Sequence, residues 1–128
     1  MKNKSFKNLL IFFLTVGLIL ISLGSAFADE QTIPNAPKNL TGNVSDSQVN
    51  LTWSTVTGAA YYNVYESLNG LTYNLISTPT TVTTSNYSMN GLTNSKMYYF
   101  KITATNTAGE SSYSNVINIT PLVATIPV

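Results

Sequence analysis

Few side chains in this sequence can carry out acid–base or nucleophilic chemistry. Its 128 residues include six lysines and five acidic residues, but no arginine, histidine or cysteine. Without histidine and cysteine there is no thiol nucleophile, no Ser–His–Asp triad, no disulfide and no ordinary zinc or haem site. Charged residues make up 9% of the chain and the net charge is +1, so the clustered basic residues that nucleic-acid binding requires are missing.

The five carboxylates are scattered along the chain. Asp29 and Glu30 lie in a polar segment and Asp46 lies in a predicted turn, whereas Glu66 and Glu110 are expected near opposite ends of one sheet. A glycosidase needs two carboxyl groups roughly 5–10 Å apart across a cleft, and calcium needs several clustered oxygen ligands. We therefore expect no catalytic residue, no metal site and no cofactor.

Lysine offers two further possibilities, and neither has a recognisable pattern here. A Ser–Lys dyad would have to use Lys96 or Lys101, which are expected on a strand and its approach with their amines in water. A Lys–Asn isopeptide bond beside a buried acid would be revealed by the loss of one ammonia from the intact mass.

Tyrosine is the residue type that best supports a binding role. Alternation along two predicted strands turns Tyr61, Tyr65 and Tyr99 outward on one sheet face. Flat aromatic rings can stack on sugars or anchor a protein partner. The alternative is structural, because tyrosine favours strands and cross-strand tyrosine pairs stabilise sheets. The sequence leaves both interpretations open.

Residues 1–28 have the pattern of a secretory signal peptide. Lys2, Lys4 and Lys7 supply a positive start, an apolar run follows from Leu9 to Leu23, and Ala26-Phe27-Ala28 is a small-x-small cleavage pattern. The apolar run is shorter than the roughly 20 residues of a membrane span. We therefore expect cleavage and a secreted, extracellular protein.

The mature chain is expected to contain one domain. Residues 29–36 form a polar linker, residues 37–121 the folded domain and residues 122–128 a short apolar tail. Three lysines against five acids leave the mature chain with a net charge of −2. Without disulfides the domain depends on its core, and a chain of about 100 residues can bury roughly two-thirds of its unfolded surface.

Short segments rich in Val, Ile, Thr and Tyr alternate with turn-forming Gly, Asn, Asp and Pro. Strict alternation over residues 48–54 places Trp53 on an inward face. Asn69-Gly70 predicts a type I′ hairpin turn. The seven predicted strands cover residues 38–44, 48–54, 61–67, 71–77, 86–89, 97–106 and 114–120. Such spacing is typical of an antiparallel β-sandwich.

Several short motifs occur together at this spacing. They are Ala36-Pro37, Leu51-Thr52-Trp53-Ser54, Tyr62-Asn63-Val64-Tyr65, Leu92 six residues before Tyr98, and the segment Asn106–Ser111. Together they resemble a fibronectin type III domain over about residues 37–121. The resemblance implies an all-β, immunoglobulin-like sandwich of seven strands without a disulfide. In it the first, second and fifth strands pack against the other four.

The resemblance also implies roles for particular residues. Trp53 would be the core tryptophan, and the Tyr98 hydroxyl would tie the crossing between the fifth and sixth strands. Tyr62 and Leu92 complete the predicted structural core. Some family members bind receptors through Arg-Gly-Asp in the loop that here covers residues 105–110. The chain has no arginine, so that activity is not carried over.

The sequence thus predicts a secreted, non-catalytic module that binds outside the cell or acts as a spacer. The alternative is a carbohydrate-binding module that uses the exposed tyrosines. The expected partner is an extracellular protein or a cell-surface glycan. Binding to nucleic acid, or to a membrane after signal cleavage, is not expected, and the protein is expected to be a monomer.

Overall fold

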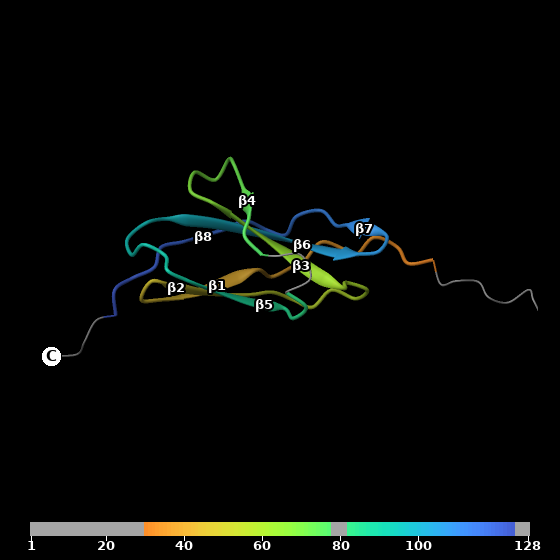
Figure 1. Cartoon of the computed structure of the whole chain (residues 1–128), viewed down its shortest axis with the longest axis horizontal. Helices are drawn as coiled ribbons and strands as arrows, with labels where there is room; N and C mark the ends of the chain where they lie inside the picture. Colours follow the sequence, from red (N-terminus) through yellow and green to blue (C-terminus); the bar gives the residue numbers. More distant parts are fainter. Residues whose placement is uncertain (1–29, 78–81, 125–128) are drawn as a thin grey trace, which may run out of the picture. The chain divides into compact units, whose positions relative to one another are not determined.

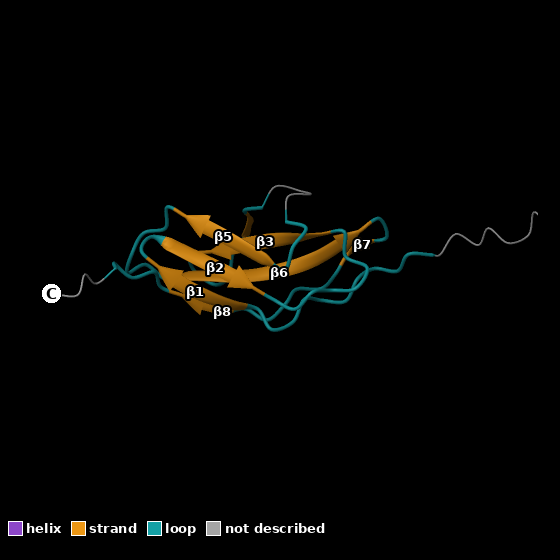
Figure 2. Ribbon diagram, turned by 90° about the horizontal axis from the view of Figure 1, so that it is seen from below, coloured by secondary structure: helices purple, strands orange, loops and turns teal. Residues whose placement is uncertain are grey.

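Two antiparallel β-sheets pack face to face in the computed structural model, which describes residues 30–77 and 82–124 (Figure 1). The first sheet has the order β1-β2-β5, and the second has the order β4-β3-β6-β7, with β8 also paired to β6. The strands are β1 (Thr41–Ser45), β2 (Gln48–Thr52), β3 (Tyr61–Ser67), β4 (Asn74–Leu75), β5 (Asn86–Asn90), β6 (Tyr98–Asn106), β7 (Gly109–Glu110) and β8 (Ile117–Ile119). In Figure 2 the strands of the first sheet overlie β3 and β6 of the second.

The all-β sandwich expected from the sequence is confirmed. The described residues contain strands, turns and loops but no helix, and so no helix capable of crossing a membrane. The predicted signal peptide, residues 1–28, and the end of the predicted tail lie outside the described residues.

The connection between β3 and β4 corrects one local prediction. A type I′ turn needs positive φ at both central residues, but only Gly70, and not Asn69, has a positive φ. The side-chain oxygen of Asn69 instead accepts the backbone N–H groups of Leu71 and Thr72, both at 2.9 Å. This side-chain contact widens the turn, so the predicted strand 71–77 is reduced to the two residues of β4.

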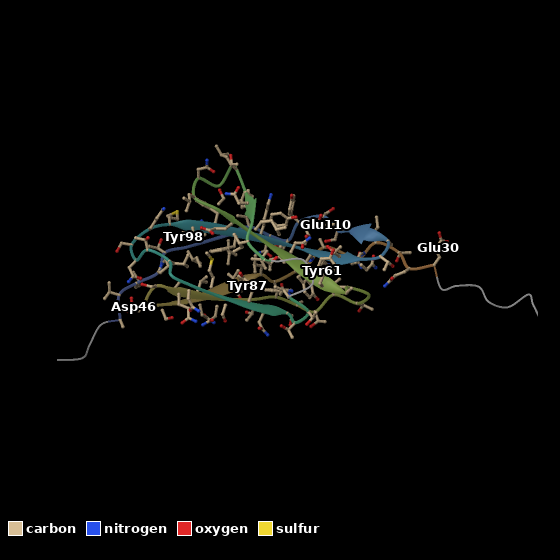
Figure 3. The ribbon with its side chains drawn as sticks, viewed as in Figure 1. Glu30, Asp46, Tyr61, Tyr87, Tyr98 and Glu110 are labelled. Atoms are coloured by element: carbon tan, nitrogen blue, oxygen red, sulfur yellow. The ribbon has the colours of Figure 1, made fainter. Side chains whose placement is uncertain are left out.

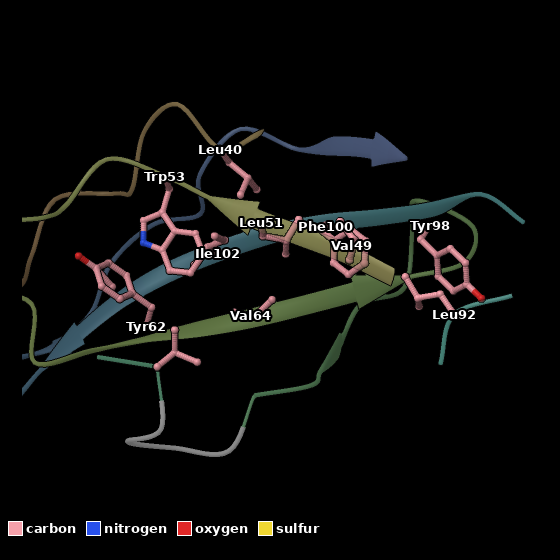
Figure 4. Packing of buried hydrophobic residues seen from close by; sticks show 12 residues of the cluster. Leu40, Val49, Leu51, Trp53, Tyr62, Val64, Leu92, Tyr98, Phe100 and Ile102 are labelled. Carbon is pink, nitrogen blue, oxygen red and sulfur yellow. The ribbon is translucent and has the colours of Figure 1, made fainter. Parts of the chain in front are cut away.

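The core lies between the two sheets (Figure 4). Alternate residues of β2, β3 and β6 supply most of it, and the flanking segments add Leu40, Trp53, Val82 and Leu92. Trp53 is 6% exposed, and its ring meets the ring of Tyr62 edge to face at a centroid distance of 5.2 Å. Phe100 and Ile102 on β6 are completely buried in the same cluster. Burial of these large rings supplies the stability that a domain without disulfides needs.

Candidate binding face on the second sheet

The outward face of β3 and β6 gathers most of the tyrosines of the chain. Residues on one strand face alternate, so Tyr61 and Tyr65 on β3 share this face with Tyr99 and Lys101 on β6. Tyr73 and Tyr113 join them from the loops, because both rings contact the Lys101 amine. We call the set Tyr61, Tyr65, Tyr73, Tyr99, Tyr113, Lys101 and Glu110 the tyrosine face.

The three predicted site residues all lie on the tyrosine face but do not form one contiguous cluster. Tyr65 stands opposite Lys101, and Tyr99 stands opposite Ser67, so the two tyrosines are diagonal neighbours. Tyr61 lies four residues along β3, or about 13 Å from Tyr65 at strand spacing. The ring of Tyr99 packs under Gly70 in the turn after β3.

Lys101 occupies the centre of the tyrosine face. Its Nζ lies 3.5 Å from the ring centroid of Tyr113 and 4.0 Å from that of Tyr73. The Tyr113 ring in turn meets Tyr65 edge to face at 5.4 Å. The ammonium group is thus held between two negative ring faces, an arrangement that stabilises the cation and restrains both rings.

Glu110 anchors the other half of the face (Figure 3). Its Oε1 accepts hydrogen bonds from the Tyr65 hydroxyl at 2.7 Å, from the Asn63 amide at 2.9 Å and from the Thr103 hydroxyl. These three donors come from β3 and β6, so the carboxylate links the short strand β7 to both central strands. The carboxylate is therefore engaged by neighbouring protein groups.

This contact shifts the pKa values of both partners in opposite directions. Burial raises the pKa of Glu110, but the hydrogen bonds from Thr103, Asn63 and Tyr65 outweigh it and leave this pKa below its usual value. Burial, followed by the bond to the Glu110 carboxylate, raises the pKa of Tyr65 to about 12. The pair is thus most stable with the carboxylate charged and the phenol neutral.

Glu66 and Glu110 lie on opposite faces of the second sheet. Glu66 shares the inward alternation of Tyr62 and Val64 on β3, whereas Glu110 contacts the outward face. Burial raises the pKa of Glu66, and the nearby Lys96 lowers it in part. Within residues 30–77 and 82–124, no group of three or more His, Cys, Asp or Glu residues is placed to hold a metal ion.

The structure also shows an exposed apolar feature that the sequence analysis missed. The hairpin from β3 to β4 projects beyond the sandwich (Figure 1) and carries Leu68, Leu71 and Leu75 at its surface. Leu71 is 86% exposed, and Leu75 stands opposite Tyr65, beside the tyrosine face. Leu68 and Leu71, which flank Asn69-Gly70, could have indicated this feature from the sequence. The prediction of a strand over residues 71–77 assigned Leu71 to a strand instead.

The hairpin tip is held in place by its own polar groups. The Ser67 hydroxyl accepts the backbone N–H groups of Asn69 and Gly70, at 3.2 Å and 2.9 Å. The Asn69 side chain accepts the backbone N–H groups of Leu71 and Thr72. The Tyr99 ring packs against Gly70. The exposed Leu71 is therefore presented by a pre-organised loop.

The domain is similar in sequence and in structure to known proteins. A family model described as fibronectin type III domain matches residues 35–120. A tail tube protein of Bacillus phage SPP1 is 31% identical over 88 residues, which are 69% of this chain and 31% of that protein. The chain therefore spans less than a third of the length of this curated relative.

Two solved structures are similar in fold and sequence. An Fn3-like protein from Clostridium thermocellum is 28% identical with a TM-score of 0.60, covering 76% of this chain and all of the other. A β-1,2-glucanase from Parabacteroides distasonis is 26% identical with a TM-score of 0.64, covering 72% of this chain but 13% of the enzyme. Because the family model matches more than half of its length, the chain belongs to the fibronectin type III domain family.

Proposed function

We propose that this protein is secreted and acts outside the cell as a non-catalytic module that binds a protein or separates other domains. The main support for a non-catalytic role comes from the tyrosine face. There Glu110 accepts three hydrogen bonds and Lys101 lies between two rings. Glu110 and Lys101 are the charged side chains of this face, and both make contacts that stabilise the surface. The similar region makes up 13% of the glucanase chain and 31% of the tail tube protein. Because it is a small part of each protein, it supports an accessory role.

The exposed hairpin is the feature best suited to contact a protein partner. Residues 67–77 carry no charge, and three leucines lie at their surface. A pre-organised apolar side chain loses little conformational entropy on binding, which is typical of an anchor residue. We therefore place the protein-binding role on Leu71 and its neighbours.

A comparison of two leucine variants tests this role. The mature protein, Leu71→Ser and the control Leu122→Ser would each be immobilised and exposed to extracellular proteins. Leu122 is also well exposed, at 59%, but lies outside the hairpin. We expect the mature protein and Leu122→Ser to retain a protein that Leu71→Ser releases. Equal retention by all three would reject the hairpin as the anchor, and retention by none would favour the spacer role.

The tyrosine face supports carbohydrate binding as a second candidate. Five tyrosines share it, and Tyr113 is 51% exposed. A nuclear magnetic resonance titration with neutral cell-wall oligosaccharides would follow the ring signals of Tyr65, Tyr99 and Tyr113. Tyr87 on β5 serves as the internal control, because it belongs to the other sheet. Signals of the tyrosine face that stay as still as those of Tyr87 would end this candidate.

A further inference from the structure

We propose that Asn90 is a site of spontaneous deamidation in the folded protein, whereas Asn69 is protected. The chain contains two Asn-Gly pairs, Asn69-Gly70 and Asn90-Gly91. Glycine is the residue that least hinders attack by its own backbone nitrogen on the preceding side chain, because it has no Cβ. The two pairs have the same local sequence, so the surrounding structure must decide between them.

The reaction needs no partner other than water. The glycine nitrogen loses its proton and bonds to Cγ of the asparagine, while the bond from Cγ to Nδ2 breaks and ammonia leaves. Water then opens the resulting succinimide at either carbonyl, which yields aspartate or isoaspartate. No oxidation or reduction occurs, and the product differs from the original chain by one ammonia lost and one water gained.

Both reacting groups are restrained at Asn69. Its Oδ1 accepts hydrogen bonds from the Ser67 hydroxyl at 3.0 Å and from two backbone N–H groups at 2.9 Å. The attacking nitrogen, that of Gly70, donates to the Ser67 hydroxyl at 2.9 Å. The ring of Tyr99 lies 3.3 Å from the position that a Cβ on Gly70 would occupy, so this turn also has little room to rearrange.

Neither restraint is found at Asn90. It is exposed at the end of β5, and Gly91 follows outside the strand with a φ of 77°. Across residues 30–77 and 82–124, neither the Asn90 carboxamide nor the Gly91 N–H makes a hydrogen bond. A Cβ on Gly91 would find no atom within 4 Å, so the segment has room to reach the geometry of attack.

The modification would alter one end of the first sheet. Asn90 pairs with Gln48, which lies two residues from Asp46. Either product places a new negative charge at this position, and isoaspartate also inserts a methylene group into the backbone where β5 ends. We expect the last pair between β2 and β5 to weaken and the protein to become more acidic with age.

Separate rates for the two asparagines test the proposal. The full chain would be aged in mildly alkaline buffer, folded or unfolded in urea, and digested for peptide mass mapping that distinguishes residue 69 from residue 90. In urea both should convert at similar rates, because both precede glycine. In the folded protein Asn90 should convert about tenfold or more faster than Asn69, whose hydrogen bonds must open first. Folded-state rates that are equal, or faster at Asn69, would overturn the proposal.

Two variants identify the cause of the difference. Ser67→Ala removes the acceptor of the Gly70 nitrogen, so conversion at Asn69 should rise while that at Asn90 stays unchanged. Asn90→Gln should remove the main acidic species that appears on ion exchange. A Ser67→Ala protein that melts normally yet leaves Asn69 unreactive would contradict the protective role of this hydroxyl. If that variant does not fold, the comparison of the folded and urea-unfolded parent still decides the proposal.

Discussion

The hydroxyl of Tyr98 accepts a hydrogen bond from the backbone N–H of Thr93 at 2.9 Å, which joins the start of β6 to the crossing from β5. Tyr62 makes a corresponding contact near the other end of the sandwich, where its hydroxyl accepts the N–H of Val56 at 2.8 Å. Both rings are buried in the core (Figure 4). Each tyrosine therefore stabilises the core with its ring and satisfies a loop amide with its hydroxyl.

These contacts predict that Tyr98→Phe and Tyr62→Phe each reduce the free energy of unfolding by about 1–3 kcal/mol, because a partly buried amide loses its acceptor. Tyr87→Phe is the matched control, since its hydroxyl reaches the Ile76 carbonyl only at 3.5 Å. Urea denaturation of the three variants makes the comparison. Equal losses in all three would show that the two short contacts have no special weight.

Replacement of the core tryptophan should be nearly sufficient to unfold the domain. Trp53→Ala is expected to cost about 3–5 kcal/mol, against a total stability of roughly 5–15 kcal/mol. Trp53→Phe should cost less, because it keeps a ring and removes an indole N–H that is buried without an acceptor among the described residues. Thermal melting measures both, and a Trp53→Ala protein that melts within a few degrees of the parent would contradict the central role of this ring.

The position of Lys101 predicts a stabilising contact between its cation and the two rings. Lys101→Met keeps most of the side-chain volume but removes the charge, and should cost about 1–2 kcal/mol, the sum of two partly exposed cation–π contacts. Lys38→Met is the control, since Lys38 is exposed and its amine lies over no aromatic ring within residues 30–77 and 82–124. Near-ultraviolet circular dichroism should report loosened tyrosines only for Lys101→Met.

Acid should weaken the link between β7 and the central strands. Because the folded-state pKa of Glu110 is lowered, its contribution to stability is present above the unfolded pKa and is lost as pH falls through the folded value. Glu110→Gln should therefore reduce the stability difference between neutral and acidic pH. Denaturation midpoints measured from pH 7 down to about pH 3 test this, and an unchanged pH profile would show that the carboxylate is not coupled to folding.

Alkali should act on the same pair through the phenol. The pKa of Tyr65 is raised to about 12, so the neutral phenol contributes stability below the unfolded value of 10.0, and this is lost as pH rises toward the folded value. Tyr65→Phe should flatten the loss of stability in this range. Spectrophotometric titration of the parent should show a tyrosine that ionises near pH 12 and that is missing from the titration curve of Tyr65→Phe. Identical high-pH regions in the two curves would contradict the raised pKa of Tyr65.

Local sequence pattern was sufficient for the central strands. Alternation over residues 61–67 predicted β3 with its correct bounds, and alternation over residues 97–106 predicted β6 to within one residue. These strands are long, and apolar inward residues alternate along them with more polar outward residues, so the period of two is strong. The strand expected at residues 71–77 was wrong in extent. The Ser67 and Asn69 side chains accept hydrogen bonds from the backbone N–H groups of residues 70–72, and these bonds compete with pairing between strands.

The fold class could be predicted from the residues alone: a β-sandwich built around a core tryptophan, in a chain with no histidine or cysteine. The sequence also placed Tyr61, Tyr65 and Tyr99 on the strands where they are found. The position of Lys101 between Tyr73 and Tyr113, and the hydrogen bond from Tyr65 to Glu110, became visible in the folded structure alone. These contacts join side chains from loops and from strands distant in the sequence. No local periodicity encodes the register and loop paths that bring them together.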